Sequence, residues 1–200
     1  MEEIKIFNRW STKGIKPKDL GLEKYINLNA RLVPRSGGKY ASRQFHKSKM
    51  NIVERLMNKM QVPGHHGKKH VMTSGRASGK TFIHYKIVKK VFENIEQQTK
   101  KNPIEVLVQA IENSATREEI TQYQVGGIML RRAVITAPQR RVDLALSNIV
   151  QSAYKKSFGK KDTMINSLTS ELTGAYNNDP QKSEAIKEKE RQEREAEGAR

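Results

Sequence analysis

Apolar residues recur at helical spacing through most of the chain after Asn51. In the first such segment they line one face at 3.6 residues per turn, which is typical of an amphipathic helix. Pro63 and Gly64 follow this segment, and both residue types end helices. We therefore predict a helix that begins at Asn51 and is ended by Pro63 and Gly64. Its predicted core face is Ile52, Val53, Leu56, Met57 and Met60.

Four further segments carry the same spacing. Ser78 is placed to cap a long helix, and Asn102 followed by Pro103 is a strong helix start. A fourth core helix follows Pro138, and Asp162 is placed to cap a fifth. The predicted core positions of these four helices are Ile83, Ile87, Val88, Val91, Phe92 and Ile95; Ile104, Leu107, Val108 and Ile111; Val142, Leu146, Ile149, Val150, Ala153 and Tyr154; and Met164, Ile165, Leu168 and Leu172.

The pattern changes between about residues 117 and 137. Two runs rich in β-forming residues are separated there by Gly126 and Gly127. Glycine readily adopts the positive φ angles that a tight two-residue turn requires. We therefore predict a β-hairpin with its turn at these glycines.

The two ends of the chain lack comparable patterns. Residues 1–48 show no sustained periodicity and hold one candidate short helix, around Leu22 to Leu32, which favours an extended basic N-terminal arm. The charged tail, residues 179–200, has a helical composition but no apolar stripe, so we expect it to need a partner. The predicted fold is mainly α: a bundle of five to six helices within residues 49–178, with a projecting β-hairpin and the N-terminal arm.

The charge of the chain indicates a polyanionic partner. Lys and Arg number 38 against 21 Asp and Glu, a formal charge of +17, and residues 1–100 hold +15 of it. Such an excess favours nucleic acid. The absence of cysteine excludes disulfides and thiol catalysis, and no apolar run approaches the roughly 18 residues of a membrane span. The N-terminal residues do not resemble a secretion signal, so we predict a cytoplasmic protein.

Basic clusters are the candidate binding residues. In the N-terminal arm the cations alternate with rings that stack on bases, and Arg140 and Arg141 lie at a helix start, where their charge opposes the helix dipole. An external anion explains that pair better than helix stability does. The predicted RNA-binding residues are Arg31, Arg35, Lys39, Arg43, Lys47, Lys49, His65, His66, Lys68, Lys69, Arg76, Lys80, Arg131, Arg132, Arg140, Arg141, Lys155, Lys156, Lys160 and Lys161.

Two short motifs suggest other functions. The run from Gly75 to Thr81 resembles a nucleotide phosphate-binding loop but has one residue too few between its glycines. Residues 64–67, GHHG, fit the GXXG loop of KH domains, although we predict no three-stranded sheet. The alternatives are thus a phosphate-loop enzyme and a KH-like regulatory RNA binder.

No metal site or catalytic site is predicted. The histidines have neither cysteines nor an HExxH helix beside them, and we interpret them as loop residues that contact RNA. No catalytic triad or buried acid pair is evident, so we predict no enzyme activity and no cofactor. The histidines concerned are His65, His66, His70 and His84.

Several motifs together resemble the small-subunit ribosomal protein seven family. In order they are residues 51–58, NIVERLMN; the helix at 79–96; residues 102–113, NPIEVLVQAIEN; residues 125–127, VGG; and residues 137–146, APQRRVDLAL. Residues 6–12, IFNRWST, and the insert around residues 65–76 are similar to the archaeal and eukaryotic branch. The resemblance extends from about Ile4 to Ala199.

The resemblance implies a structural constituent of the small ribosomal subunit. Such a protein binds the 3′ major domain of small-subunit ribosomal RNA and nucleates assembly of the head. Its hairpin lies near exit-site transfer RNA and messenger RNA, and its neighbours are other ribosomal proteins of the head and platform. The acidic end of this chain makes direct RNA contact by the tail doubtful.

Overall fold

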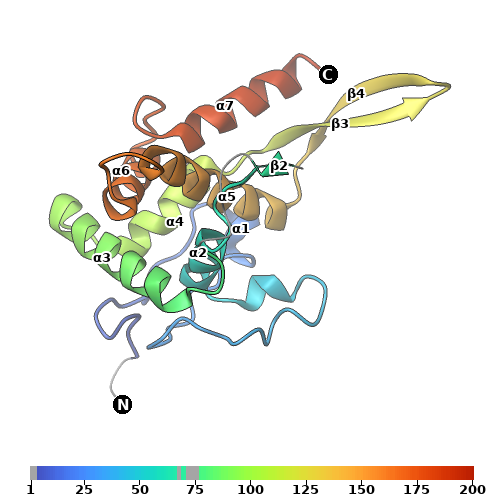
Figure 1. Cartoon of the computed structure of the whole chain (residues 1–200). Helices are drawn as coiled ribbons and strands as arrows, with labels where there is room; N and C mark the ends of the chain where they lie inside the picture. Colours follow the sequence, from blue (N-terminus) through green and yellow to red (C-terminus); the bar gives the residue numbers. More distant parts are fainter. Residues whose placement is uncertain (1–3, 67–68, 71–76) are drawn as a thin grey trace.

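A bundle of helices with one projecting β-hairpin forms the fold (Figure 1). The computed structural model describes residues 4–66, 69–70 and 77–200, with residues 65, 66, 69 and 70 described through their backbone only. The elements are α1 (Leu20–Glu23), the 3₁₀ helix η1 (His46–Lys49), α2 (Ile52–Met60), β1 (His65–His66), β2 (Lys69–His70), α3 (Thr81–Thr99), α4 (Pro103–Ser114), β3 (Glu118–Val125), β4 (Ile128–Ile135), α5 (Pro138–Ser157), α6 (Met164–Tyr176) and α7 (Glu184–Glu197). The predicted fold class is therefore confirmed.

Periodicity identified most of the core correctly. The predicted faces of α2 and α4 are fully buried, as are the aliphatic positions of α5. Helix α6 contacts α3, α4 and α5, and α2 packs against α3 and α5. At α4 the predicted start is also confirmed, because Asn102 accepts a hydrogen bond from the Ile104 amide and Pro103 occupies the first turn. Burial of one apolar stripe per helix supplies the main driving force for this packing.

Two helix starts and one short helix were predicted incorrectly. Lys80, not Ser78, precedes α3, and the Ser78 hydroxyl donates instead to the Gln61 carbonyl. Thr163, not Asp162, caps α6 by accepting from the Asn166 amide. The helix predicted for Leu22–Leu32 is the single turn α1. Ser, Thr and Asp all cap helices well, so their order in sequence does not decide which of two neighbours is used.

The first turn of α3 is rotated relative to the prediction. Ile83 is 50% exposed, whereas His84 is 5% exposed and its ring Nε2 lies 3.0 Å from the Ala77 carbonyl oxygen. The interpretation of His84 as a loop histidine that contacts RNA is therefore wrong. A helix face repeats at three and four residues, and position 84 lies on the same face as the buried Val88 and Val91.

The extended N-terminal arm is not confirmed, because much of this segment enters the core. Ile6, Phe7 and Trp10 are at most 5% exposed, and the rings of Phe7 and Trp10 pack edge-on against Phe92 of α3 with centroids 5.9 and 5.6 Å away. Leu22 and Ile26 are also buried. Irregular backbone can carry core residues without any periodic signature, which is why the sequence pattern missed them.

The hairpin has the predicted position and turn. Strands β3 and β4 pair antiparallel from Glu118 opposite Ile135 to Val125 opposite Ile128. Gly126 and Gly127 have φ angles of 55° and 86°. Two successive positive φ angles match the turn type that suits the twist of a hairpin. The strands extend well beyond the helices, so the turn lies far from the core (Figure 1).

The C-terminal helix finds its partner within the chain. Helix α7 lies beside the base of the hairpin and also contacts α5 (Figure 1). Ala185, Ile186 and Ala196 are buried, and the Lys189 ammonium donates to the Asn113 carbonyl at 2.8 Å. The few apolar residues of this helix are therefore enough to attach it to the core, and the partner that it was expected to need is supplied by α4, α5 and β3.

Candidate RNA interface

The segment from Arg31 to Lys49 presents several cations that have no carboxylate partner within the described part of the chain. It is fastened by the buried carboxylate of Glu54, which accepts hydrogen bonds of 2.6 Å from both the amide and the hydroxyl of Ser36. Among the described residues, Arg35, Lys39 and Arg43 have exposed side chains and no carboxylate partner. Unpaired cations on an ordered loop can pair with phosphates without first breaking an internal ion pair.

Aromatic side chains accompany these cations. The Arg31 guanidinium donates to the Tyr40 hydroxyl at 3.0 Å and lies 5.9 Å from the centre of its ring. Phe45 is 69% exposed and holds a positive φ of 63° just before η1. Its ring is therefore available to a base, as predicted for this segment. Lys49 is also exposed, and its ammonium lies 3.4 Å from the His46 ring.

The cations at the start of α5 have partners inside the chain. Arg140 forms three hydrogen bonds to Glu119: its Nε donates to the two carboxylate oxygens at 2.7 and 2.9 Å, and a terminal nitrogen donates at 2.8 Å. Arg141 pairs with Asp19 at 2.8 Å. Burial raises the pKa of Asp19, but the hydrogen bonds from Arg141 and the Gly21 amide, together with the charges of Arg141 and Arg117, outweigh burial and lower the pKa below its ordinary value. The argument that this pair needs an external anion is therefore wrong, because carboxylates from β3 and the N-terminal segment oppose its charge.

The basic clusters at the end of α5 contain both paired and unpaired lysines. Lys156 donates to the fully buried Glu171 at 2.7 Å, and Lys155 lies 3.6 Å from Glu184. Lys160 and Lys161 are exposed and have no carboxylate partner among the described residues. Lys47 also pairs internally, with Asp143 at 2.9 Å. The predicted site residues thus form two groups, those already paired and those free to bind an anion.

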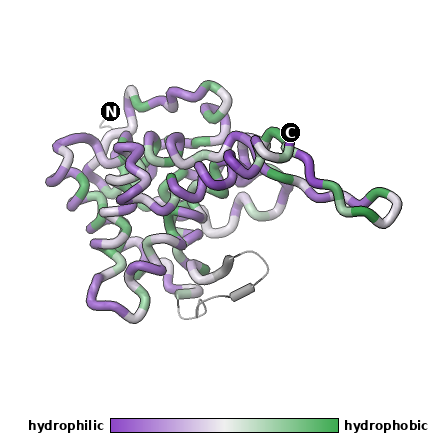
Figure 2. Tube along the Cα trace, turned by 90° about the horizontal axis from the view of Figure 1, so that it is seen from above, coloured by the Kyte–Doolittle hydropathy of each residue, from purple (hydrophilic) through white to green (hydrophobic). Residues whose placement is uncertain are grey.

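The hairpin offers a different kind of surface. Arg131 and Arg132 are exposed and adjacent on β4, so they point to opposite faces of the ribbon. Towards the turn the exposed side chains are mostly apolar, which gives the green segments of the hairpin in Figure 2. These are Tyr123, Val125, Ile128, Met129 and Leu130. Several exposed apolar side chains gathered on a projecting element are typical of a contact surface.

A second aromatic and basic surface lies at the start of α3 and was missed by the sequence reasoning. Phe82 is 68% exposed, stacks parallel to Tyr85, and carries the Lys86 ammonium 4.6 Å above its ring. Lys80 is exposed one turn earlier. The signal was present, because Phe82 and Lys86 lie four residues apart on a helix, but the incorrect helix phase concealed it.

Part of the predicted site lies in the loop before α3. Lys68, Arg76 and the glycines of the two short motifs at positions 67 and 75 lie outside the described residues. His65, His66 and Lys69 belong to the two-residue strands β1 and β2. Within the described residues, the sheets are two two-stranded ribbons rather than the sheet of a KH domain, and no group of three His, Asp or Glu side chains is placed to hold a metal ion.

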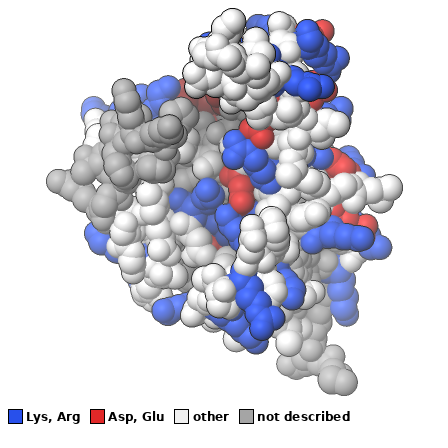
Figure 3. Space-filling model, turned by 90° about the vertical axis from the view of Figure 1, so that its right-hand side faces the viewer, with Lys and Arg blue, Asp and Glu red and all other residues white. Residues whose placement is uncertain are grey.

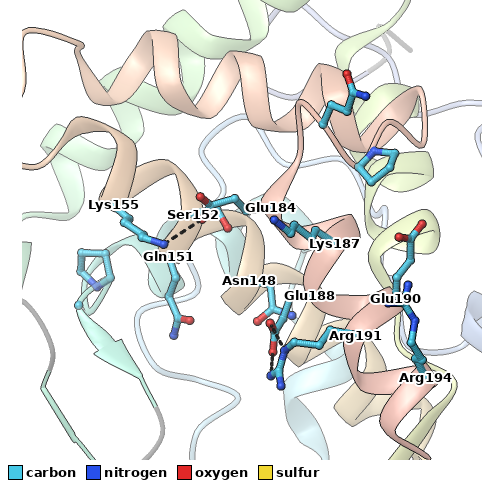
Figure 4. Close-up of a pocket in the computed structure, with 14 residues that line it drawn as sticks. Asn148, Gln151, Ser152, Lys155, Glu184, Lys187, Glu188, Glu190, Arg191 and Arg194 are labelled. Carbon is cyan, nitrogen blue, oxygen red and sulfur yellow. Dashed lines mark hydrogen bonds and ion pairs between the residues drawn. The ribbon is translucent and has the colours of Figure 1, made fainter. Parts of the chain in front are cut away.

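A polar groove of about 910 Å³ between α5 and α7 does not resemble a catalytic cleft (Figure 4). Its charged groups largely pair with one another: Arg191 contacts Glu188 at 2.6 Å and Lys155 contacts Glu184. Asn148, Gln151 and Ser152 line the α5 side. These pairs oppose much of the charge within the groove.

Charge is spread over the end of the molecule from which the hairpin projects. Lys and Arg side chains are distributed across this face, with scattered Asp and Glu among them (Figure 3). Among the residues that the structure describes, no helix is both long and apolar enough to cross a bilayer. The arrangement of free cations, exposed rings and a rigid scaffold suits a folded RNA.

Comparisons with known proteins give a consistent result. A family model described as ribosomal protein S7p/S5e matches residues 22–200. A small ribosomal subunit protein uS7 from Nanoarchaeum equitans is 44% identical over 198 residues, which cover 99% of this chain and all of the relative. Proteins of the same name from Methanothrix thermoacetophila and Methanothermobacter thermautotrophicus are 41% and 43% identical and span 98% and 97% of this chain, and 100% and 98% of their own lengths.

Proposed function

The chain belongs to the ribosomal protein S7p/S5e family, in its archaeal branch, and has a structural role in the small ribosomal subunit rather than an enzymatic one; we propose that it binds the 3′ major domain of the small-subunit ribosomal RNA. In this role it nucleates folding of the head during assembly. The family membership agrees with the resemblance found in the sequence.

The observation that supports this proposal is the distribution of unpaired cations. Arg35, Lys39 and Arg43 project from a loop that Glu54 holds in place, and exposed Phe45 belongs to the same segment. Lys80 with the Phe82 ring and Lys160 with Lys161 add further contacts. Phosphate pairing along several elements, combined with ring stacking, fits a folded junction of helices better than a short single strand.

The hairpin has a separate task in this proposal. Its apolar turn region and its two arginines reach beyond the helical bundle, which leaves them accessible to other RNAs. In line with the family resemblance, the hairpin contacts exit-site transfer RNA and messenger RNA after assembly. Helix α7 and the hairpin base face neighbouring proteins of the head and platform. The protein therefore acts within the ribosome, with the core and the 31–49 segment on ribosomal RNA.

Chemical footprinting tests the proposed RNA target. The purified chain should protect a folded multi-helix junction of the 3′ major domain and should co-sediment with small subunits. A matched RNA of equal length from another ribosomal domain serves as the control. Protection of only a short single strand, with equal affinity for both RNAs, would favour a KH-like regulatory binder and contradict the proposal.

A further inference from the structure

A small hollow between η1, α2 and α5 concentrates positive charge. Its volume is about 320 Å³. Lys47 comes from η1, Arg55 and Lys59 come from α2, and Asp143 and Ser147 come from α5. Asn58 and Val62 complete the lining. Residues distant in sequence therefore converge here because three elements pack against one another.

The hollow holds more cations than its carboxylate can neutralise. Asp143 is shared, since it accepts from Lys47 at 2.9 Å and from Arg55 at 3.0 Å. Among the residues that the structure describes, the one hydrogen-bond partner of the Lys59 ammonium is the neutral Ser147 hydroxyl, at 3.3 Å. Three cations thus oppose one carboxylate. Burial, reinforced by the charge of Lys47, lowers the pKa of Lys59, which is the expected response of a crowded cation.

The burial of Arg55 makes the excess of positive charge in the hollow destabilising for the fold. It is 2% exposed, donates to the Tyr25 carbonyl at 2.8 Å and to Asp143, and its buried Nε has no hydrogen-bond partner among the described residues. Buried charge that is incompletely paired destabilises a fold. An anion in the hollow would pair with Lys59 and neutralise part of the excess positive charge. Without an anion, this excess charge destabilises the folded protein.

We propose that this hollow binds a single phosphate group, with Lys59 and Lys47 contacting its oxygens and Arg55 supporting them from beneath. Two sources offer this chemistry: a backbone phosphate of RNA and free inorganic phosphate. The RNA source rests on the proposed function, whereas the anion site itself does not. Lys59 and Arg55 thereby join the binding residues, although neither belongs to a conspicuous basic run in the sequence.

Thermal melting in phosphate tests the anion site without RNA. Replacing chloride by inorganic phosphate at equal ionic strength should raise the melting temperature of the full chain by roughly 2–4 °C. Lys59→Met should lose this shift, and Lys59→Arg should retain it. The control is Lys90→Met, which removes an equally charged but exposed lysine on α3 and should retain the full shift.

The melting temperatures of wild type and Lys59→Met in chloride test whether the excess positive charge destabilises the free protein. Because Lys59→Met relieves repulsion in the hollow, this variant should melt no lower than the wild type. Equal phosphate shifts in wild type and Lys59→Met, or no shift in either, would overturn the proposal. A lower melting temperature of Lys59→Met in chloride would contradict the argument from excess charge.

Salt titration of RNA binding identifies the source of the phosphate. If a backbone phosphate occupies the hollow, Lys59→Met should reduce the slope of log affinity against log salt by about 1, while Lys90→Met leaves it unchanged. If Lys59→Met leaves the salt slope of RNA binding unchanged but loses the rise in melting temperature in phosphate, the hollow is a site for free phosphate. If the wild type failed to bind ribosomal RNA yet kept its phosphate shift, the proposed function would fail and the anion site would stand.

Discussion

At the scale of single residues, the pairing state of a cation decides its value for RNA binding. Within the described part of the chain, Arg43 is exposed without a carboxylate partner, whereas Arg140 is held by three hydrogen bonds to Glu119. Replacing Arg43 by Ala should therefore weaken ribosomal RNA binding more than replacing Arg140 by Ala does. Arg140→Ala should also change stability little, by about 0–1 kcal/mol, because its ion pair is largely exposed. Filter binding and thermal melting of both variants measure this, and equal affinity losses would contradict it.

A second residue-scale prediction concerns acid sensitivity at Asp143. Burial would raise its pKa, but hydrogen bonds from Lys47 and the charge of Arg55 outweigh burial, so the pKa lies below its ordinary value of 3.8. A carboxyl with a lowered folded-state pKa stabilises the protein above its unfolded-state value and loses that contribution as pH falls through the folded-state value. Urea unfolding between pH 6 and 3 should show a smaller loss of stability for Asp143→Asn than for wild type. A steeper loss in the variant would contradict this assignment.

At the scale of elements, the predictable parts were those with a repeating pattern. The faces of α2 and α4 and the turn at Gly126 could be predicted because period 3.6 and paired glycines have few structural solutions. The burial of Trp10 could not, because it lies in irregular backbone. Nor could the Arg140–Glu119 pair, which depends on how the hairpin base meets α5. Residue type therefore identified the candidate cations of the site. Only the fold shows which of these cations are paired within the chain and which are unpaired.

Hydrogen exchange separates the two parts of the N-terminal segment. Amides around Ile6, Trp10 and Leu22 should be protected in the free protein, because these side chains belong to the core. Amides between Arg35 and Phe45 should be less protected in the free protein than those of the core and should slow further on RNA, since few of the segment's side chains are buried. The exception should be the Ser36 amide, which donates to the buried Glu54. Rapid exchange throughout residues 4–48 would contradict this division of the segment.

The hairpin can be tested as a separate element. Two strands whose outer portion has little support from the bundle contribute little to core stability. Replacing residues 120–134 by a short Gly/Ser turn should leave the helical bundle folded and ribosomal RNA binding largely intact, while exit-site occupancy or reading-frame maintenance changes. Circular dichroism, filter binding and a frameshift reporter measure these effects. Loss of ribosomal RNA binding by a folded variant would show that the hairpin is a primary assembly element.

At the scale of the whole molecule, the charge excess of +17 and the rigid bundle act together. Internal ion pairs such as Lys156–Glu171 and Arg141–Asp19 neutralise some of the basic side chains and join elements that are distant in sequence. The remaining cations are displayed on a fixed scaffold, which lowers the entropy lost on binding. Affinity for RNA should therefore combine strong salt dependence with a preference for one folded shape.

The measurement that tests this account most directly is the affinity of the purified chain for a 3′ major domain fragment across a salt series, beside an unrelated folded RNA of equal length. If about 6–10 phosphates are neutralised, affinity for the fragment should fall by roughly 10³–10⁵ between 50 and 200 mM salt on the scale established for duplexes. The fragment should bind more tightly than the unrelated RNA at every salt concentration. A salt-insensitive affinity, or equal affinity for the two RNAs, would contradict the account.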